Sequence, residues 1–398
     1  MVFAMGFVLF ALGILISVAL HECGHMWAAQ ATGMKVRRYF VGFGPTLWST
    51  HRGETEYGVK AIPLGGFCDI AGMTAMDEVR PEELDRAMYR QATWKRMVVM
   101  AGGIAMNFVL GFLLIVVLAV GWGLPRLDEP TPTVGTLSCV ADANPDGTLQ
   151  ACTGLGPAQQ GGLQPGDTIT AVNGVAVDTW SEFTEQTRKQ QGPITYTVDR
   201  AGQRVQVTVA PQQVTRYAKD GAKTQVSAVG VTLDNPPIEQ YNVVTAVPAA
   251  ASFTGDLFVR TFESLAQMPA KVAALWDAVT GGARDPETPV SIYGASRIGG
   301  ESAQAGLWQV FVLMLASLNF FLGAFNILPL LPLDGGHMAV VLYEKLRDTV
   351  RGWRGLAPAG PVDYLKLLPA TYVAVVLGGA YMVLTLAADI VNPIRLFP

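Results

Sequence analysis

The chain has 398 residues, of which 50% are hydrophobic and only 15% are charged, and its formal net charge is −4. Soluble domains carry charge on about a quarter of their residues, so this composition excludes one large soluble protein. It also excludes collagen-like, disordered and disulfide-scaffold proteins. The slightly acidic balance gives no basic patch, so no nucleic-acid partner is expected.

Four long apolar segments with almost no charged residues predict four membrane-spanning helices. A spanning helix needs about 20 apolar residues, and the apolar runs predict spans at 3–30, 97–121, 308–331 and 367–389. The alternative for the first run is a signal peptide, but the run lacks a basic start and a convincing cleavage site. The sequence therefore predicts a multi-pass protein of the cell membrane (the inner or plasma membrane), embedded in the lipid bilayer.

Basic residues indicate which segments face the cytoplasm. Residues 30–96 contain ten lysines and arginines and residues 335–366 contain five, whereas the much longer stretch 123–307 contains twelve. Because basic loops stay on the cytoplasmic side, we expect 30–96 and 335–366 in the cytoplasm and 123–307 outside. Cys139 and Cys152 are the two cysteines of the external stretch, where we expect a disulfide; two free thiols are the alternative.

The first predicted span ends in the motif His21-Glu22-Cys23-Gly24-His25. Residues four apart lie on one face of a helix, so His21 and His25 can bind one zinc ion. Glu22 lies beside them, where it can act on a water molecule. Such groups at membrane depth are usually functional; the structural alternative is a polar pair packed between helices.

A third zinc ligand is expected at Asp334. A catalytic zinc has three protein ligands and one open position, and Asp334 ends the uncharged run of the third span. The first and third spans run in the same direction, which places both motifs toward the cytoplasmic face. Pro329 and Pro332 are expected to break the helix, and Gly335-Gly336 to loosen the chain after the aspartate. The alternative is an ordinary residue at a helix end.

These motifs resemble those of the site-2 protease family of intramembrane zinc metalloproteases, and look most like its actinobacterial members. The resemblance covers essentially the whole chain and rests on H-E-C-G-H, on N-I-L-P-L-L-P-L-D-G-G at 326–336, and on the segments 63–67 and 289–292. The second proline, Pro332, and the glycine at Gly103 depart from the family pattern. Both departures concern helix shape and neither concerns a ligand.

The resemblance implies site roles and a reaction. It implies a Zn²⁺ cofactor bound by His21, His25 and Asp334, water activated by Glu22, and substrate backbone or oxyanion bound by Asn326. The reaction would be hydrolysis of a peptide bond within or near the transmembrane segment of a single-span protein. Anti-sigma factors or signal-peptide remnants, already cleaved outside by a site-1 protease, would be the substrates.

Two functions from other classes are weighed against this one. A membrane adaptor with a structural zinc would need a fourth protein ligand, and none is evident. A metal transporter would need polar residues at several membrane levels, and the second and fourth spans contain almost none. His337 is expected to turn into the cytoplasm and His51 to lie on a surface loop, so neither is expected to bind zinc.

The segments between the spans predict strands. Val41–Trp48 and Tyr57–Ile62 have strand patterns, which the family resemblance extends to a membrane-associated sheet. Its residues Gly65, Gly66 and Phe67 would meet an extended substrate. Residues 74–96 predict a cytoplasmic surface helix, and residues 250–280 predict an amphipathic helix on the outer face.

The external stretch resembles a bacterial PDZ domain. Residues 162–169 with Asn173-Gly174 match its core, between strands at 168–172, 194–198 and 204–209. The PDZ groove would bind a trimmed substrate end or screen out bulky substrates; a simple spacer is the alternative.

The predicted fold class is a polytopic α-helical membrane protein with four transmembrane helices, a membrane-associated β-hairpin or sheet, and an extracytoplasmic α+β PDZ domain. The expected segments are the first span with its H-E-x-x-H motif (1–34), the cytoplasmic β region and surface helix (35–96), the second span (97–122), the PDZ-like domain (123–212), an external extension (213–307), the third span with Asp334 (308–334), a cytoplasmic loop (335–366) and the fourth span (367–391).

Overall fold

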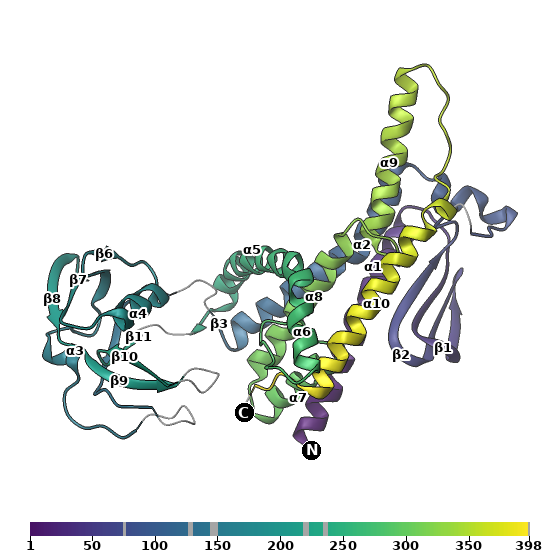
Figure 1. The fold of residues 1–398 in the computed structure, drawn as a ribbon. Coiled ribbons are helices and arrows are strands. Elements are labelled where there is room, and N and C mark those ends of the chain that lie inside the picture. The colour runs from purple at the N-terminus through teal and green to yellow at the C-terminus, as the bar shows by residue number, and fades with distance from the viewer. Residues whose placement is uncertain (75–76, 126–129, 144–149, 218–222, 234–237, 397–398) are drawn as a thin grey trace. The chain divides into compact units, whose positions relative to one another are not determined.

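The computed structural model describes residues 1–74, 77–125, 130–143, 150–217, 223–233 and 238–396. The chain divides into two compact units (Figure 1). Met1–Leu124 together with Gln240–Pro398 form the first, which we call the helical unit, and Pro125–Glu239 form the strand-rich unit.

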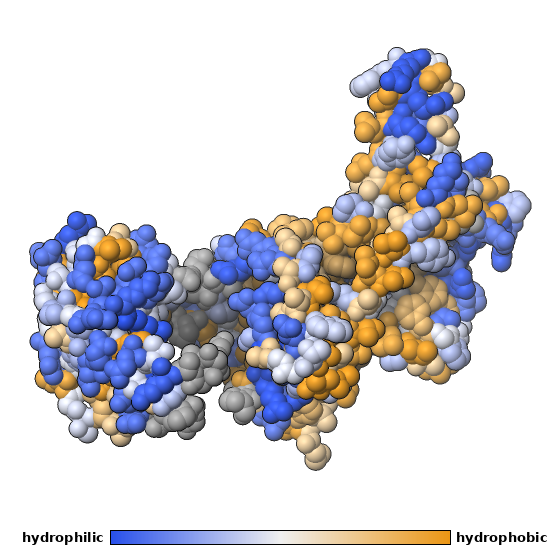
Figure 2. All heavy atoms as spheres, viewed as in Figure 1, coloured by the Kyte–Doolittle hydropathy of each residue, from blue (hydrophilic) through white to orange (hydrophobic). Residues whose placement is uncertain are grey.

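Four helices of the helical unit are long and apolar enough to cross a membrane. They are α1 (Val2–Ala31), α2 (Thr93–Gly121), α8 (Trp308–Ile327) and α10 (Leu368–Val391), and they lie where the four spans are predicted. Hydrophobic residues gather on the surface over α10 (Figure 2), where Val376, Leu377 and Val383 are exposed. Outward-facing aliphatic side chains suit contact with lipid.

Small residues let these helices approach closely. A Cβ atom added to Gly24 of α1 would lie 2.2 Å from the carbonyl oxygen of Gly102 in α2. Close approach through glycine is typical of helix pairs in membranes. A hydrogen bond also joins α8 to α1, since Nδ2 of the buried Asn319 donates to Oγ of Ser17 over 3.0 Å.

The hairpin that follows α1 is longer than predicted and folds back on itself. It consists of β1 (Val36–Arg52) and β2 (Thr55–Ile70), and Val41 pairs with both Val59 and Gly66. The pairs place four segments side by side in the order 46–52, 55–60, 36–43 and 62–70. Gly42 and Gly44 bend β1, because their φ angles of 92° and 80° are ones that favour glycine.

The prediction of one surface helix over 74–96 is wrong. The described part of this segment forms two short 3₁₀ helices, η1 (Pro81–Arg86) and η2 (Met88–Arg90), and α2 already begins at Thr93; residues 75 and 76 lie outside the described residues. Ion pairs explain the difference. The Arg37 guanidinium on β1 binds Glu83 over 2.8 Å and Asp77 over 3.3 Å, so the acidic residues face the hairpin.

The amphipathic helix predicted over 250–280 begins earlier and is interrupted. The structure has α5 (Val243–Gln267), η3 (Met268–Lys271) and α6 (Val272–Val279), followed by α7 (Ile292–Gln304). Pro269 lies at the interruption, where its missing N–H cannot continue an α-helix. Helix α5 contacts α2, with the Phe258 and Phe108 rings 5.5 Å apart.

The chain after α8 does not loosen as predicted. The predicted cytoplasmic loop instead begins with α9 (Asp334–Trp353) and ends with η4 (Tyr364–Lys366). Cβ atoms added to Gly335 and Gly336 would lie 2.2 Å from the Ile327 oxygen and 2.6 Å from the Leu330 carbonyl carbon. The two glycines therefore allow the first turn of α9 to pack tightly against residues 327–331.

A buried ion pair fixes α9 to α2. Arg96 at the start of α2 lies 2.6 Å from Glu344 of α9, and both side chains are about one-tenth exposed. The other Glu344 oxygen accepts the backbone N–H of Val362 over 2.7 Å.

The strand-rich unit is built on a four-stranded antiparallel sheet of order β6–β5–β7–β8, with Ile169 and Tyr196 fully buried in its core. Its elements are β4 (Val134–Leu137), α3 (Pro157–Gln160), β5 (Thr168–Val172), β6 (Val175–Ala176), α4 (Trp180–Lys189), β7 (Ile194–Arg200), β8 (Gln203–Val209), β9 (Gln212–Tyr217), β10 (Lys223–Ala228) and β11 (Val231–Leu233). Short strands β3 (Leu124–Pro125) and β12 (Ile238–Glu239) lie where the chain enters and leaves this unit.

The strand-rich unit extends beyond the predicted boundary at residue 212. Its limit is Glu239, because β11 pairs with β4, with Val231 opposite Leu137. Cys139 and Cys152 are joined by a disulfide in the structure, with their Cα atoms 5.9 Å apart.

A buried carboxylate in this unit gives a pH-dependent prediction. Asp167 accepts hydrogen bonds from Arg200 over 2.7 Å and from the Gln164 N–H over 2.8 Å. Burial raises the pKa of Asp167, but these donors outweigh it and hold the pKa below its usual value. We expect Asp167→Asn to destabilise the unit by about 1–3 kcal/mol at pH 7, measured by hydrogen exchange of the β5 and β7 amides in the full chain.

The sign of the pH effect follows from the lowered pKa. The stabilisation is present above the unfolded pKa of about 3.9 and is lost as the pH falls through the folded-state value. The difference in stability between wild type and Asp167→Asn, measured by the same hydrogen exchange, should therefore be smaller at pH 3 than at pH 7. Glu185→Gln, which breaks an exposed pair with Lys189, is the control and should change exchange little. Equal effects of both variants at pH 7 would contradict the prediction.

Candidate metal centre

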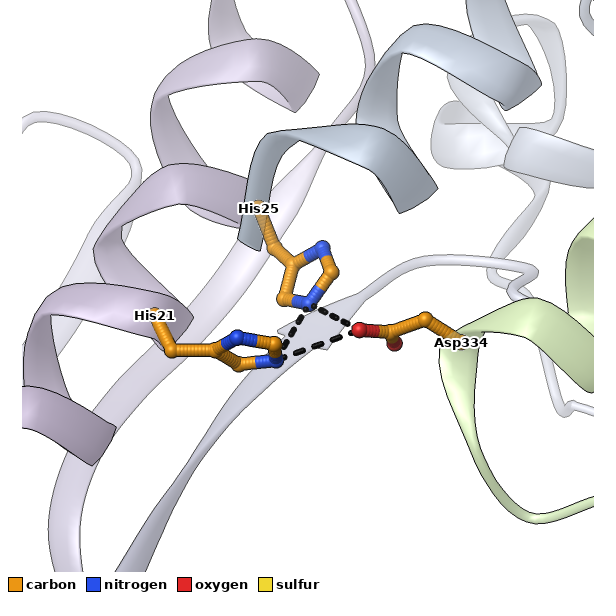
Figure 3. Close-up of side chains that lie close together, drawn as sticks. All are labelled: His21, His25 and Asp334. Atoms are coloured by element: carbon orange, nitrogen blue, oxygen red, sulfur yellow. Dashed lines mark hydrogen bonds and ion pairs between the residues drawn. The ribbon is translucent and has the colours of Figure 1, made fainter. Parts of the chain in front are cut away.

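The structure brings His21, His25 and Asp334 together (Figure 3). Nε2 of His21 and Nε2 of His25 lie 3.1 Å and 3.2 Å from Oδ2 of Asp334, and 3.1 Å from one another. The two histidines lie one helical turn apart on α1, and Asp334 is the first residue of α9. We call these three residues the His–His–Asp cluster.

The donor atoms of the cluster fit a zinc ion. Two imidazole nitrogens and one carboxylate oxygen form a ligand set typical of catalytic zinc, which leaves a fourth position open. Both imidazoles are buried. Among the described residues, the buried Oδ2 of Asp334 has no hydrogen-bonding neighbour apart from these two rings. A cation bound between the three atoms would accept a lone pair from each of them.

Helix α2 contacts the other nitrogen of each ring. Nδ1 of His25 donates to the backbone carbonyl of Val99 over 2.8 Å, which leaves its Nε2 without a proton and able to bind a metal. Nδ1 of His21 lies 3.1 Å from the side-chain amide of Asn107.

Glu22 is next to the cluster but contributes no atom to it. Its carboxylate lies beside the backbone of Cys68 in β2, and a Cβ atom added to Gly66 would be 3.5 Å from its Cγ. The hairpin therefore covers Glu22 on one side.

The remaining predicted substrate residues lie on two elements. Gly65, Gly66 and Phe67 lie in β2, and the Phe67 ring stacks on Phe40 with centroids 5.7 Å apart. Asn326 lies in the last turn of α8, where its Nδ2 donates to the carbonyl of Leu322. No contact of Asn326 with the cluster is found among the described residues, so its substrate role stays a prediction.

The two other histidines lie outside the cluster. Nδ1 of His337 in α9 lies 3.2 Å from the Tyr364 hydroxyl oxygen, and His51 is exposed but lies near the end of strand β1 rather than on the predicted loop.

The contribution of α2 to this site was not predicted from the sequence. The signal was present, because Asn107 is a lone amide within the uncharged run 97–121 and polar groups at membrane depth are usually functional. The role of the Val99 carbonyl had no sequence signal, since every residue carries one.

The contact between Gly24 and Gly102 gives a second prediction. We expect Gly24→Ala to force α1 from α2, because the new Cβ atom would meet the Gly102 backbone at 2.2 Å. Overpacking of this kind costs about 1–3 kcal/mol. The bond between His25 and Val99 crosses the same interface, so zinc content should fall together with thermal stability.

Gly378→Ala in α10 is the matched control, since a Cβ atom there meets nothing within 4 Å. It should leave both the unfolding temperature and the zinc content unchanged. If Gly24→Ala behaves like this control, the packing argument is wrong.

The long apolar helices, and a His–His–Asp cluster whose two histidines belong to a helical H-E-x-x-H motif, define a membrane metallopeptidase. The sequence profile of Peptidase family M50 matches residues 9–355. The chain belongs to this family, the site-2 proteases. It is a membrane protein and a metalloendopeptidase.

Curated relatives agree with this assignment. The chain is 54% identical over 405 aligned positions to Zinc metalloprotease Rip1 of Mycolicibacterium smegmatis, and 53% identical over 403 positions to Zinc metalloprotease Rip1 of Mycobacterium tuberculosis; each alignment covers 100% of both chains. Metalloprotease MmpA of Caulobacter vibrioides is 28% identical over 372 positions, which cover 85% of each chain.

Proposed function

We propose that this protein is a zinc-dependent intramembrane endopeptidase that hydrolyses a peptide bond within or near the transmembrane segment of single-span proteins. The observation that carries the proposal is the convergence of His21, His25 and Asp334 beside Glu22, at the end of an apolar helix. The name of the mycobacterial relatives, zinc metalloprotease, supports zinc as the metal.

Each residue of the site has a distinct task in this reaction. His21, His25 and Asp334 would hold the zinc ion, which supplies a positive charge that acidifies water and polarises a carbonyl group. Glu22 accepts a proton from the attacking water and passes it to the nitrogen of the leaving amine. Its carboxylate is available for both transfers because it is not one of the ligands.

A substrate must be extended before its backbone can react. The edge of the hairpin could bind the substrate in this extended form. Segment 62–70 of β2 pairs with β1 on one side only, as far as the described residues go, and contains Gly66 beside Glu22. A substrate strand that adds to this edge would gain backbone hydrogen bonds and lie next to the base. Gly65, Gly66 and Phe67 would line its path, and Asn326 would bind its backbone or the oxyanion.

We propose that residues 35–96 and 335–366 face the cytoplasm and that the strand-rich unit, as a PDZ domain, lies outside. The basic residues of the first two segments and the Cys139–Cys152 disulfide support this orientation, since disulfides persist in oxidising compartments. Thiol labelling of single-cysteine variants at positions 185 and 363 in intact cells tests this orientation.

By family resemblance, the substrates are anti-sigma factors or signal-peptide remnants that a site-1 protease has already shortened.

A cleavage assay with purified protein tests the proposed activity. Two synthetic single-span substrates, with and without an extracytoplasmic domain, are incubated with the protein in detergent, and product ends are identified by mass spectrometry. We expect cleavage within or near the transmembrane segment of the shortened substrate, loss of cleavage with a chelator, and recovery with zinc. Stoichiometric zinc that resists chelation, with no product, would instead favour a structural zinc in an adaptor.

A further inference from the structure

Helix α2 places one polar side chain against the metal centre that the mechanism does not use. Asn107 is 1% exposed, and the nitrogen end of its amide lies 3.1 Å from Nδ1 of His21. The oxygen end, Oδ1, is buried without a hydrogen-bond partner among the described residues. A buried amide oxygen that lacks a donor costs about 1–3 kcal/mol, so this arrangement requires an explanation.

The chemistry of a metal-bound histidine supplies the explanation. A neutral imidazole that binds a metal through Nε2 carries its proton on Nδ1, and this N–H needs an acceptor. Nε2 of His21 is the nitrogen that faces Asp334. The amide nitrogen of Asn107 is itself a donor. In its present orientation, the N–H groups of Asn107 and of His21 Nδ1 would point at one another, and neither would have an acceptor there.

A half-turn of the Asn107 amide about its Cβ–Cγ bond resolves both problems. The oxygen and nitrogen of an amide occupy nearly the same space, so the exchange needs no change in packing. Oδ1 then accepts the Nδ1 proton of His21. The oxygen that lacked a donor gains one, and the lone pair of Nε2 points at the cluster.

The second ligand shows the same design. Nδ1 of His25 donates to the Val99 carbonyl over 2.8 Å, also from α2, and its Nε2 faces Asp334 at 3.2 Å. Both ligand rings thus lie between an acceptor on α2 and the aspartate of α9. For His25 the acceptor is a backbone group that no substitution removes, whereas for His21 it is a side chain that can be changed.

We propose that Asn107 is a positioning residue of the metal centre, whose side-chain oxygen accepts the Nδ1 proton of His21 and leaves Nε2 to bind the metal. The inference rests on the proposed zinc function. An acceptor on the far side of a ligand histidine fixes the ring and makes it a stronger ligand, and losing such a partner weakens metal binding by about 10–100-fold.

Zinc affinity of the full chain in detergent, measured by competition with a fluorescent chelator, tests the proposal. Asn107→Leu keeps the approximate size of the side chain and removes the acceptor, so we expect zinc to bind about 10–100-fold more weakly. Asn107→Asp keeps an acceptor oxygen and should bind zinc at least as tightly as wild type. Asn319→Leu is the matched control, because it removes another buried amide that has no contact with a ligand, and it should leave the affinity unchanged.

Each outcome decides one point. If wild type binds zinc and Asn107→Leu binds it as tightly, the positioning role is wrong while the proposed function stands; if wild type binds no zinc, the proposed function fails. Affinity lost equally in Asn107→Asp and Asn107→Leu would show that an acceptor is not what matters.

A measurement on the wild type covers the case in which Asn107→Leu does not fold. The chain contains four histidines, so ring-¹⁵N labelling gives a simple spectrum. In the zinc-loaded protein we expect His21 to bind through Nε2, with an Nδ1 proton that exchanges slowly and lies close to Asn107. Zinc bound through Nδ1 of His21 would overturn the proposal.

Discussion

Replacement of Glu22 by glutamine is expected to lower the rate of peptide-bond cleavage by about 10²–10⁴-fold, the contribution typical of a general base. Glutamine keeps the shape of the side chain beside Cys68 and Gly66 but cannot accept a proton from water. Because Glu22 contributes no atom to the His–His–Asp cluster, the variant should retain its zinc. Cleavage is measured by mass spectrometry of the products and zinc by elemental analysis.

Glu54→Gln is the control for this variant. Glu54 is an exposed carboxylate at the tip of the hairpin, paired with Lys35 and Arg86, so cleavage should continue at the wild-type rate. If Glu22→Gln cleaves as fast as this control, Glu22 is not the base and the proposed mechanism is wrong. The inactive variant should also retain substrates, so membrane proteins that accumulate on it identify the natural ones.

Replacement of Asp334 by asparagine is expected to remove both zinc and activity. The carboxylate supplies the only negative charge among the three candidate ligands, and both imidazoles converge on its Oδ2. Zinc affinity should fall by more than about 100-fold, because the loss of a partner outside the ligand set already costs 10–100-fold. Chelator competition measures this directly, and the hydrolytic rate should fall with the zinc content.

The matched control for this variant is Asp363→Asn. Asp363 caps the start of η4 by accepting the N–H of Leu365, a position where asparagine serves as well as aspartate. Its zinc affinity should equal that of wild type. Full zinc occupancy in Asp334→Asn would mean that the metal has another third ligand, and His337 would be the next residue to test.

Local patterns in the sequence were sufficient to predict the long helices and the cluster. An uncharged run of about 20 residues has few alternatives to a helix that crosses the bilayer, and the spacing of His21 and His25 fixes their common face. Asp334 was chosen because it ends the uncharged run of the third span, and the common direction of the first and third spans supported that choice. The strand at Thr168–Val172 has the predicted bounds.

The features that were missed depend on packing between distant segments. The rotation of α2 about its axis decides whether Asn107 meets His21 or lipid, and no periodicity in an evenly apolar helix reveals it. The Gly335-Gly336 pair was interpreted as loose chain, although its glycines serve close contact with residues 327–331. The acidic segment near Glu83 was assigned to a helix because the sequence does not show that Arg37 binds it.

The order of the ligands along the chain has a consequence for biogenesis. His21 and His25 emerge early in synthesis, whereas Asp334 follows more than three hundred residues later, at the start of α9. Chains are made from the N-terminus, so a partly made chain carries two of the three candidate ligands but no complete cluster. On the proposed function, the nascent chain would therefore lack a metal site, and hence proteolytic activity, until α9 has been made.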